Sequence, residues 1–390
     1  MPKRLTILLP IAMFLITGNS YMIHAQVVPA AWKTEKYVKF LHGKKIGIVA
    51  NAASVVGKVN IVDTLIRCGT DIRVIFSPEH GFRNFIEAGE EAGDYTDPVT
   101  RLQVISLYGI KKKPADMDLQ GLDLVVFYIQ DVGVRFYTYI STLSLLMEAC
   151  AENHIPLLVL DTPNPNASYI DGPVLDPRYK SFVGMHPVPM VYGMTIGEYA
   201  RMVNGEGWLG KELQCDLTVF PIDDYTHRTA FVPVEKPSPN LANGNSIILY
   251  PSLCLFEGTV ISVGRGTPFP FEVYGHPDLK GYDFSFTPRP LPGIDSHPRY
   301  KGKLCYGEDL RNYYNEHPSE KGKIILTWLL RAFKKTGKKE FFTDYFDHLA
   351  GNATLKEQII RGMDEDQIRR SWQAGIQEFR KIRQKYLLYP

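Results

Sequence analysis

The spacing of apolar residues along the first half of the chain alternates between the patterns of buried strands and of helices. Short runs rich in Val, Ile and Leu predict strands at 44–51, 72–76, 103–107, 122–130, 156–160 and 217–220. Helical spacing predicts helices at 59–69 and 141–153. A strand, a helix and a second strand in succession form a βαβ unit, which requires a parallel sheet. The run at 122–130 is apolar throughout, as expected when helices cover both faces of that sheet.

Acidic residues follow three of the predicted strands. Glu79, Asp131 and Asp161 each stand at or just beyond the carboxyl end of an apolar run. In a doubly wound sheet these ends lie along one rim, and ligands bind there. The pattern therefore predicts that the three carboxylates converge.

The hydrophobic pattern is less regular after residue 171. Glu198 follows Thr195 at the spacing of a helix capping box, so we interpret Glu198 as structural. A proline-rich passage at 233–240 opens a stretch with many glycines and prolines. Helical spacing returns at 321–334, 355–361 and 366–386. We therefore expect an α/β domain over 26–225 and a second domain over 226–390.

The first 25 residues have the pattern of a leader. Lys3 and Arg4 precede an apolar run at 5–16, and Ala25 stands before Gln26. This order is typical of a secretory signal peptide, and the run is short for a membrane-spanning helix. We expect a signal peptide over 1–25, a secreted, periplasmic mature protein, and no membrane association after cleavage. An uncleaved N-terminal anchor is the alternative.

Composition and charge narrow the classes of partner. A hydrophobic content of 45% is ordinary for a folded protein, and a net charge of +2 gives no basic field for nucleic acid. The five cysteines are scattered without metal-ligand spacing, as are the histidines. We expect no nucleic-acid partner, no metal site and no cofactor, and the sequence does not define an oligomeric state.

The densest group of reactive side chains follows the second predicted strand. Glu79 and His80 stand at the strand end, and Arg83 and Glu90 come soon after. A carboxylate in a partly desolvated cleft is suited to general acid catalysis. The alternative is a structural pair, with the glutamate capping a turn and the histidine satisfied by hydrogen bonds.

Two further groups could bind a ligand. In QDVGVRFYTY, Arg135 could bind a carboxylate with both nitrogens, beside Asp131 and Tyr137, or an Asp–Arg pair could simply hold the loop. In the group at 257–272, Arg265 lies between two glycines that lack phosphate-loop and dinucleotide spacing, so we predict an arginine on a rigid loop facing the first domain. Neither Gly-x-Ser-x-Gly nor His-Glu-x-x-His occurs, which leaves serine hydrolase and zinc peptidase readings without support.

Longer blocks of sequence resemble one known family. They run in order over nearly the whole mature chain: SPEHGF, EAGE, VISLYG, IQDVGVRFYTYISTL, LDTPNP, GPVL, GMTIGE, PSPN, YPSLCLFEGT, SVGRGTPFPFE and WQAGIQEFRKIRQKYLLYP. With them the chain resembles the NamZ-type exo-β-N-acetylmuramidases, bacterial glycoside hydrolases of peptidoglycan recycling that were formerly a domain of unknown function. The resemblance implies a Rossmann-like N-terminal domain with a mostly parallel sheet, and a smaller α+β C-terminal domain that closes the active-site cleft. It also implies release of N-acetylmuramic acid (MurNAc) from the non-reducing end of peptidoglycan fragments or muropeptides.

The same resemblance implies roles for particular residues. Glu79 would be a catalytic carboxylate, and since a glycosidase needs two, Glu90 or Asp131 would supply the second. The cleft would also be lined by substrate-binding residues, namely His80, Arg83, Arg135, Tyr137, Asn164, Arg265 and Glu272. Arg135 or Arg265 would bind the lactyl carboxylate that distinguishes MurNAc from N-acetylglucosamine (GlcNAc).

Three positions depart from the family pattern. Tyr128 and Thr162 stand where relatives have Asp and Arg, and Asn84 stands where a Gly is common. Tyr128 and Thr162 motivate a second hypothesis, a catalytically impaired muropeptide- or carbohydrate-binding protein that uses the same cleft. A third, a nucleotide- or metal-dependent hydrolase, rests only on the α/β pattern.

Overall fold

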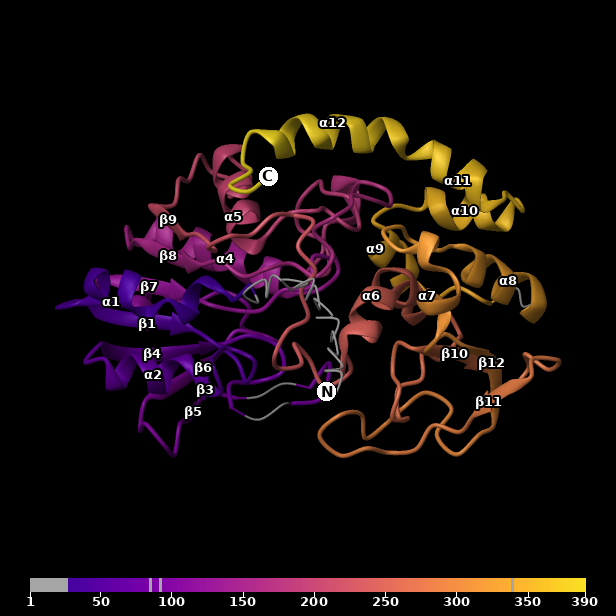
Figure 1. Ribbon diagram of the computed structural model, residues 1–390, viewed down its shortest axis with the longest axis horizontal. Helices are drawn as coiled ribbons and strands as arrows, with labels where there is room; N and C mark the ends of the chain where they lie inside the picture. Colours follow the sequence, from indigo (N-terminus) through magenta and orange to yellow (C-terminus); the bar gives the residue numbers. More distant parts are fainter. Residues whose placement is uncertain (1–26, 84–85, 91–92, 338–339) are drawn as a thin grey trace, which may run out of the picture.

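The computed structural model describes residues 27–83, 86–90, 93–337 and 340–390. The predicted leader at 1–25 and Asn84 lie outside these residues. An N-terminal α/β domain built on one large sheet packs beside a C-terminal domain of helices and a small sheet (Figure 1). Within the described ranges, no helix combines the length and the apolar character needed to cross a membrane.

A seven-stranded sheet, counted over the described residues, forms the centre of the N-terminal domain. The strands are β1 (Lys45–Val49), β4 (Asp71–Ser77), β5 (Tyr95–Thr96), β6 (Gln103–Ser106), β7 (Leu124–Phe127), β8 (Leu157–Leu160) and β9 (Leu217–Phe220). Their order is β5-β6-β4-β1-β7-β8-β9, and β5 pairs antiparallel with β6 while the others run parallel. Taken along the chain, the parallel strands follow the 3-2-1-4-5-6 order of Rossmann sheets. The predicted α/β class and mostly parallel sheet are confirmed.

Helices cover both faces of the sheet, which explains why the strands β7 and β8 are apolar throughout. The helices of this domain are α1 (Thr34–Leu41), α2 (Ile61–Arg67), α3 (Asp116–Leu119), α4 (Tyr139–Glu152) and α5 (Ile196–Gly205), and a small hairpin joins β2 (Val55–Val56) to β3 (Val59–Asn60). Leu124 and Val126 of β7 belong to the core cluster that includes α1 and α2. Val125 and Phe127 belong to the cluster that includes α4 and α5. Alternate residues of one strand therefore serve opposite layers.

The C-terminal domain contains a small antiparallel sheet that the sequence pattern did not predict. Its strands, β10 (Val273–His276), β11 (Phe284–Phe286) and β12 (Cys305–Asp309), lie in the order β10-β12-β11. The helices are α6 (Gly244–Leu253), α7 (Tyr313–Glu316), α8 (Thr327–Thr336), α9 (Tyr345–Ala350), α10 (Thr354–Ile360), α11 (Glu365–Ser371) and α12 (Gln373–Gln384). Cys254–Gly258 forms a 3-10 helix directly after α6.

Two predicted helices differ from the structure. The helix expected at 321–334 begins only at Thr327, because the amides of Ile324 and Ile325 bind the side chains of Asp171 and Ser252 instead of a helical carbonyl. The helix expected at 366–386 is interrupted at Trp372, between α11 and α12.

The end of the chain returns to the N-terminal domain. Figure 1 shows α12 running from the C-terminal domain back toward α5. Arg383 donates to the carbonyl of Gly193 at 2.8 Å, and Lys385 pairs with Glu206 at 2.9 Å. These contacts hold the two domains together at one side of the molecule.

Candidate active site

A cavity of about 870 Å³ lies between the two domains. Glu79, Tyr108 and Thr138 line it from loops that follow β4, β6 and β7, so the cavity opens at the carboxyl ends of the parallel strands. We call this side the N-terminal wall. The facing side, called the C-terminal wall, includes Glu257 and Arg265.

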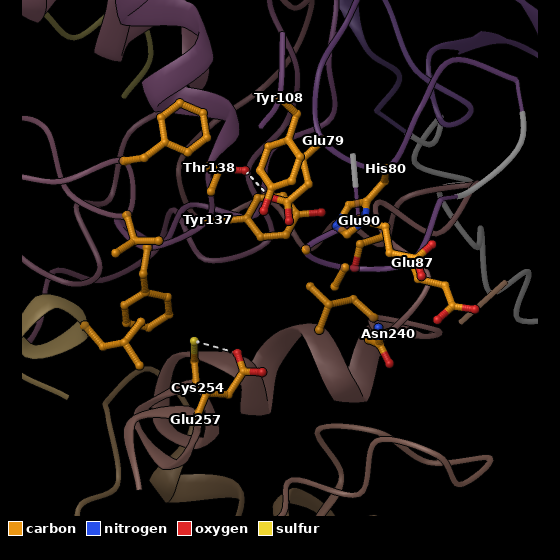
Figure 2. Close-up of a pocket in the computed structure, with 18 of the residues that line it drawn as sticks. Glu79, His80, Glu87, Glu90, Tyr108, Tyr137, Thr138, Asn240, Cys254 and Glu257 are labelled. Atoms are coloured by element: carbon orange, nitrogen blue, oxygen red, sulfur yellow. Dashed lines mark hydrogen bonds between the residues drawn. The ribbon is translucent and has the colours of Figure 1, made fainter. Parts of the chain in front are cut away.

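Glu79 and His80 are held by the turn at the end of β4. The Glu79 carboxylate accepts a hydrogen bond of 2.6 Å from the hydroxyl of Thr138, just before α4 (Figure 2). His80 has a φ of 74°, a left-handed conformation that is rare for a residue with a side chain and is often found at functional sites. Its ring nitrogen Nδ1 lies 3.2 Å from the carbonyl of Ile86. Burial lowers the pKa of His80, and the adjacent Glu79 charge only partly opposes this, so the ring is neutral near pH 7.

Glu257 faces Glu79 from the opposite side of the cavity (Figure 2). It stands on the 3-10 helix after α6, and its Oε1 lies 2.8 Å from Nε of Arg265. Gly258 is required beside it, because a Cβ there would lie 2.4 Å from the Cα of Phe346 in α9. The C-terminal wall is thus a rigid unit of the 3-10 helix, α9 and the Arg265 loop.

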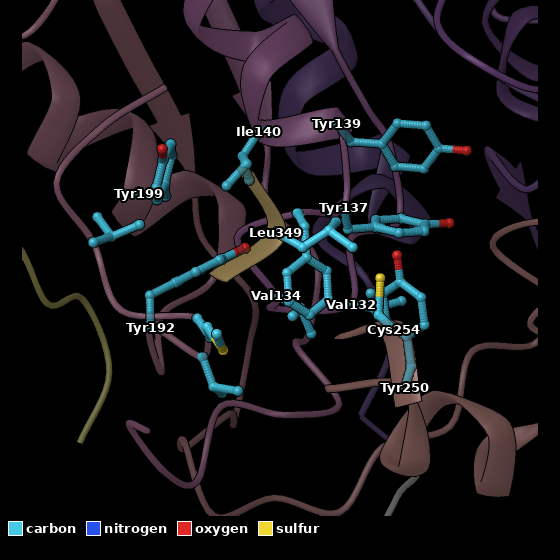
Figure 3. Close-up of a cluster of buried hydrophobic side chains, with 14 of the residues drawn as sticks. Val132, Val134, Tyr137, Tyr139, Ile140, Tyr192, Tyr199, Tyr250, Cys254 and Leu349 are labelled. Atoms are coloured by element: carbon cyan, nitrogen blue, oxygen red, sulfur yellow. The ribbon is translucent and has the colours of Figure 1, made fainter. Parts of the chain in front are cut away.

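Five residues predicted for the site line this cavity: Glu79, His80, Glu90, Tyr137 and Arg265. Glu90 is exposed, whereas Tyr137 is buried in the floor. There the ring of Tyr137 packs edge-on against that of Tyr250, with 5.9 Å between centroids. Figure 3 shows Tyr137, Tyr250 and Cys254 close together in the hydrophobic core, and all three also line the cavity.

Five other predicted residues do not line the cavity: Arg83, Asp131, Arg135, Asn164 and Glu272. Arg83 is instead fixed between two acids, with contacts of 2.7 Å to Asp63 and to Asp97. The Glu272 carboxylate accepts hydrogen bonds from Asn243 and Asn245 at the start of α6. Both residues therefore hold neighbouring chain segments in place.

Asp131 and Asn164 shape the loop after β7. The buried Asp131 carboxylate accepts a hydrogen bond from the amide of Gly133 at 2.7 Å and another from the hydroxyl of Tyr192. Burial raises the pKa of Asp131 to about 6, although the Tyr192 and Gly133 hydrogen bonds oppose the change. A Cβ on Gly133 would lie 2.1 Å from Oδ1 of Asn164, so these side chains fix a tight turn below the cavity. The third strand-end carboxylate, Asp161, is also buried, and it binds Thr195 and Tyr389 rather than joining Glu79.

Arg135 has neither of the partners expected from the sequence. Its buried guanidinium donates to four backbone carbonyls at 2.8–2.9 Å, those of Pro173, Val188, Leu349 and Ala350. Burial lowers its pKa to about 9. Because the guanidinium is enclosed by protein, Arg135 joins the N-terminal domain to the end of α9 and is not placed to contact a ligand in the cavity.

Sequence reasoning gave no role to several residues of the cavity. Glu257 stood in a group noted for Arg265, and Tyr108, Thr138 and Asp295 were not singled out as candidates. A glutamate inside the apolar run LCLFEGT was the available signal for Glu257. Burial raises the pKa of Asp295, with the Arg265 charge opposing it, so the C-terminal wall carries a second partly desolvated carboxyl group.

Tyr128 and Thr162, which depart from the family pattern, lie outside the cavity. The buried Tyr128 donates its hydroxyl hydrogen to the carbonyl of Val55 at 2.8 Å, and Thr162 donates to that of Ile129 at 3.4 Å. Neither residue lines the cavity. In the part of the chain that the structure describes, no group of three or more His, Cys, Asp or Glu side chains is arranged to hold a metal ion.

Family models match the chain in two consecutive parts. Residues 46–245 match the N-terminal model of exo-β-N-acetylmuramidase NamZ, and residues 248–389 match its C-terminal model. The chain is similar to the peptidoglycan β-N-acetylmuramidase NamZ of Bacillus subtilis strain 168, with 38% identity over 375 residues that cover 90% of this chain and 89% of that protein.

Two solved structures share the fold. Both are DUF1343 family proteins from Bacteroides fragilis NCTC 9343, and the alignments cover 94% of this chain and 99% of each of theirs. One is 43% identical with a TM-score of 0.87, and the other is 26% identical with a TM-score of 0.78.

Proposed function

The chain belongs to the NamZ family of exo-β-N-acetylmuramidases, and we propose that it releases MurNAc from the non-reducing end of peptidoglycan fragments. The observation that carries this proposal is a pair of glutamates, Glu79 and Glu257, on opposite walls of one cavity. A volume of about 870 Å³ is within the range of pockets that enclose a small ligand. Glycoside hydrolysis uses two carboxyl groups that flank the scissile bond.

The surroundings of the two glutamates assign them different tasks. The Glu79 carboxylate accepts a hydrogen bond from the Thr138 hydroxyl, and we assign Glu79 two proton transfers: it protonates the glycosidic oxygen as that oxygen leaves the anomeric carbon, and it then takes a proton from the water that attacks this carbon. Glu257 is held in place by its ion pair with Arg265, which suits it to stabilise the positive charge that develops at the anomeric carbon. Glu90 lines the same cavity from an exposed position, and Asp131 lies outside it.

The test is a set of matched Glu→Gln variants at positions 79, 257 and 90, assayed on the disaccharide MurNAc-β-1,4-GlcNAc. We expect kcat to fall about 10²- to 10⁴-fold for Glu79→Gln and for Glu257→Gln, because each removes a group that acts on the reacting atoms. Glu90→Gln should keep kcat within a few-fold and serves as the control. A Glu79→Gln protein with wild-type turnover would remove Glu79 from the mechanism. A loss in Glu79→Gln and Glu90→Gln, with wild-type turnover in Glu257→Gln, would make Glu90 the second carboxylate in place of Glu257.

The binding-only hypothesis is not favoured. It was motivated by Tyr128 and Thr162, and both side chains are satisfied by backbone carbonyls away from the cavity. It predicts tight binding of MurNAc-β-1,4-GlcNAc by the wild-type protein with no release of MurNAc over a long incubation, which the same assay detects.

We further propose that the protein is exported to the periplasm. The support is the leader pattern at 1–25 and a proposed substrate that derives from the cell wall. N-terminal sequencing of the protein purified from cells should give Gln26 as the first residue, whereas a retained Met1 would favour the uncleaved anchor.

A further inference from the structure

Within the described residues, the lysine and the arginine that line the cavity differ in whether an acidic residue pairs with them. Arg265 and Lys112 are the lysine or arginine residues that line it within the described chain. Arg265 is paired with Glu257 at 2.8 Å, so its charge is already balanced. Lys112 has no acidic partner among the described residues, and its side chain is exposed at the wall. Among the lysines and arginines of the described residues, the cavity therefore offers one uncompensated positive charge to a ligand.

The lysines on either side of Lys112 are both held in ion pairs, whereas Lys112 has no such pair in the part of the chain that the structure describes. Three lysines follow one another in the loop after β6. Lys111 pairs with Asp118 at 2.6 Å and Lys113 with Glu148 at 2.9 Å, so both of these charges are used within the fold. The ammonium group of Lys112 instead lies 5.1 Å from the centre of the Phe182 ring. Such a cation–π contact positions the ammonium group without neutralising it.

Phe182 belongs to the same part of the wall. It lines the cavity, and its ring centroid lies 6.2 Å from that of Tyr108, another lining residue. Lys112, Phe182 and Tyr108 thus form a surface with aromatic rings and one free charge, which we call the 108–182 platform. Apolar ring faces suit the C–H faces of a sugar, and the ammonium group suits an anion attached to it.

The proposed substrate carries one group that requires such a charge. MurNAc differs from GlcNAc by a lactyl ether on O3, and this ether ends in a carboxylate. Of the arginines expected to bind it, Arg135 is enclosed by four carbonyls and Arg265 is occupied by Glu257. A lysine is a compact charge on a flexible stem, so it can follow a rotatable lactyl group.

We propose that Lys112, positioned by Phe182, binds the lactyl carboxylate and selects MurNAc over sugars that lack this charge. This inference rests on the proposed function and names the residue that would set its specificity. Substrates whose lactyl carboxylate is converted to an amide, as in muramoyl peptides, lose the ion pair and should be poorer substrates than peptide-free ones.

The experiment compares two chromogenic β-glycosides, one of MurNAc and one of its lactyl N-methylamide, for the wild type, Lys112→Met and Lys113→Met. For wild type we expect the acid to be preferred about 10- to 100-fold in kcat/KM, the size of a charged hydrogen bond. Lys112→Met should lose this preference by raising KM for the acid with little change in kcat. Lys113→Met removes a neighbouring charge outside the cavity and should keep the preference.

The outcomes separate this inference from the function on which it rests. A wild-type enzyme that cleaves the acid and the amide equally, or a Lys112→Met variant that still prefers the acid, overturns the role of Lys112 and leaves the glycosidase intact. A wild-type protein that cleaves neither glycoside nor the natural disaccharide overturns the proposed function itself. Lys112→Arg provides a further check, because it retains the charge and should retain the preference.

Discussion

Among single residues, Asp131 is a buried carboxylate that does not line the cavity. Its partners are the Gly133 amide and the Tyr192 hydroxyl, and its pKa is raised to about 6 by burial. A raised pKa means that the folded state prefers the protonated form. The resulting stabilisation is present below the ordinary pKa of 3.8 and is lost as the pH rises through about 6.

Asp131→Asn tests this assignment and the catalytic role predicted from the sequence. Asparagine keeps an oxygen for the Gly133 and Tyr192 hydrogen bonds but cannot ionise, so the stability of wild type relative to the variant should fall by about 2 kcal/mol between pH 4 and pH 7. Denaturant unfolding at several pH values measures this difference, and activity on the disaccharide should stay within a few-fold of wild type. A loss of activity as large as that of Glu79→Gln, with stability unchanged, would restore Asp131 to the catalytic pair.

For single residues, the sequence pattern predicted that Glu79 and His80 lie at the ligand site, because a polar pair directly after an apolar strand is a local feature. It could not place Arg83, whose partners Asp63 and Asp97 lie on other segments of the chain, or Arg135, whose partners are farther still. The carbonyls of Leu349 and Ala350 are more than 200 residues from Arg135. A charged residue in a loop has the same local pattern whether it faces a ligand or is enclosed by carbonyls.

At the scale of elements, α9 connects the two walls of the cavity. Its last two carbonyls accept hydrogen bonds from Arg135, while Phe346 packs against Gly258 on the 3-10 helix that carries Glu257. Carbonyls at the end of a helix lack intrahelical partners and carry partial negative charge, which suits a buried cation. Arg135 is therefore a positioning residue for the C-terminal wall.

Arg135→Met should destabilise the protein by about 3 kcal/mol or more, because four carbonyls each lose the hydrogen bond that the guanidinium donates. It should also lower kcat, since α9 and Glu257 are no longer fixed opposite Glu79. The matched control is Arg369→Met, which removes another arginine that joins the domains, through Asp171 at 2.6 Å, but touches no residue of the C-terminal wall named above. Thermal unfolding and kcat on the disaccharide are the measurements, both made below the unfolding temperature.

Gly351→Ala gives an independent check of this link. Gly351 has a φ of 77°, and an added Cβ would lie 2.5 Å from Nη2 of Arg135. The substitution should therefore reproduce the loss of kcat seen in Arg135→Met. If Arg135→Met and Arg369→Met lower stability equally and both keep wild-type kcat, Arg135 contributes only to stability.

The elements themselves differed in how well the sequence predicted them. The parallel strands of the central sheet were predicted from their apolar runs, most clearly β7 and β8, which are buried at every position. The exposed two-residue strand β5 has no such run and was not predicted. The strands of the small sheet are short, and they occur among glycines and prolines that are typical of turns. The segment before α8 has helical spacing, but its amides bind side chains of Asp171 and Ser252, which no local pattern records.

At the scale of the whole molecule, the cavity depends on contacts that join the domains on several sides. Arg135 and Arg369 hold the C-terminal helices, and α12 returns to the N-terminal domain through Arg383. Within the described residues, Glu87 adds a contact at the cavity itself: its carboxylate accepts from the amides of Gly293 and Ser296 and from the Ser296 hydroxyl. The domain arrangement was expected from the family resemblance, but these contacts were not.

Glu87→Ala should weaken substrate binding without unfolding the protein. The variant loses three hydrogen bonds that join the two domains at the edge of the cavity, so we expect KM for the disaccharide to rise about 10-fold while kcat changes little. The melting temperature should change much less than in Arg135→Met, because Glu87 lies near solvent and holds only a loop. Ser296→Ala removes one of the three contacts and should give a smaller rise in KM. An unchanged KM in Glu87→Ala would mean that this contact does not shape the binding site, and that the fixed helices alone hold the cavity in its binding form.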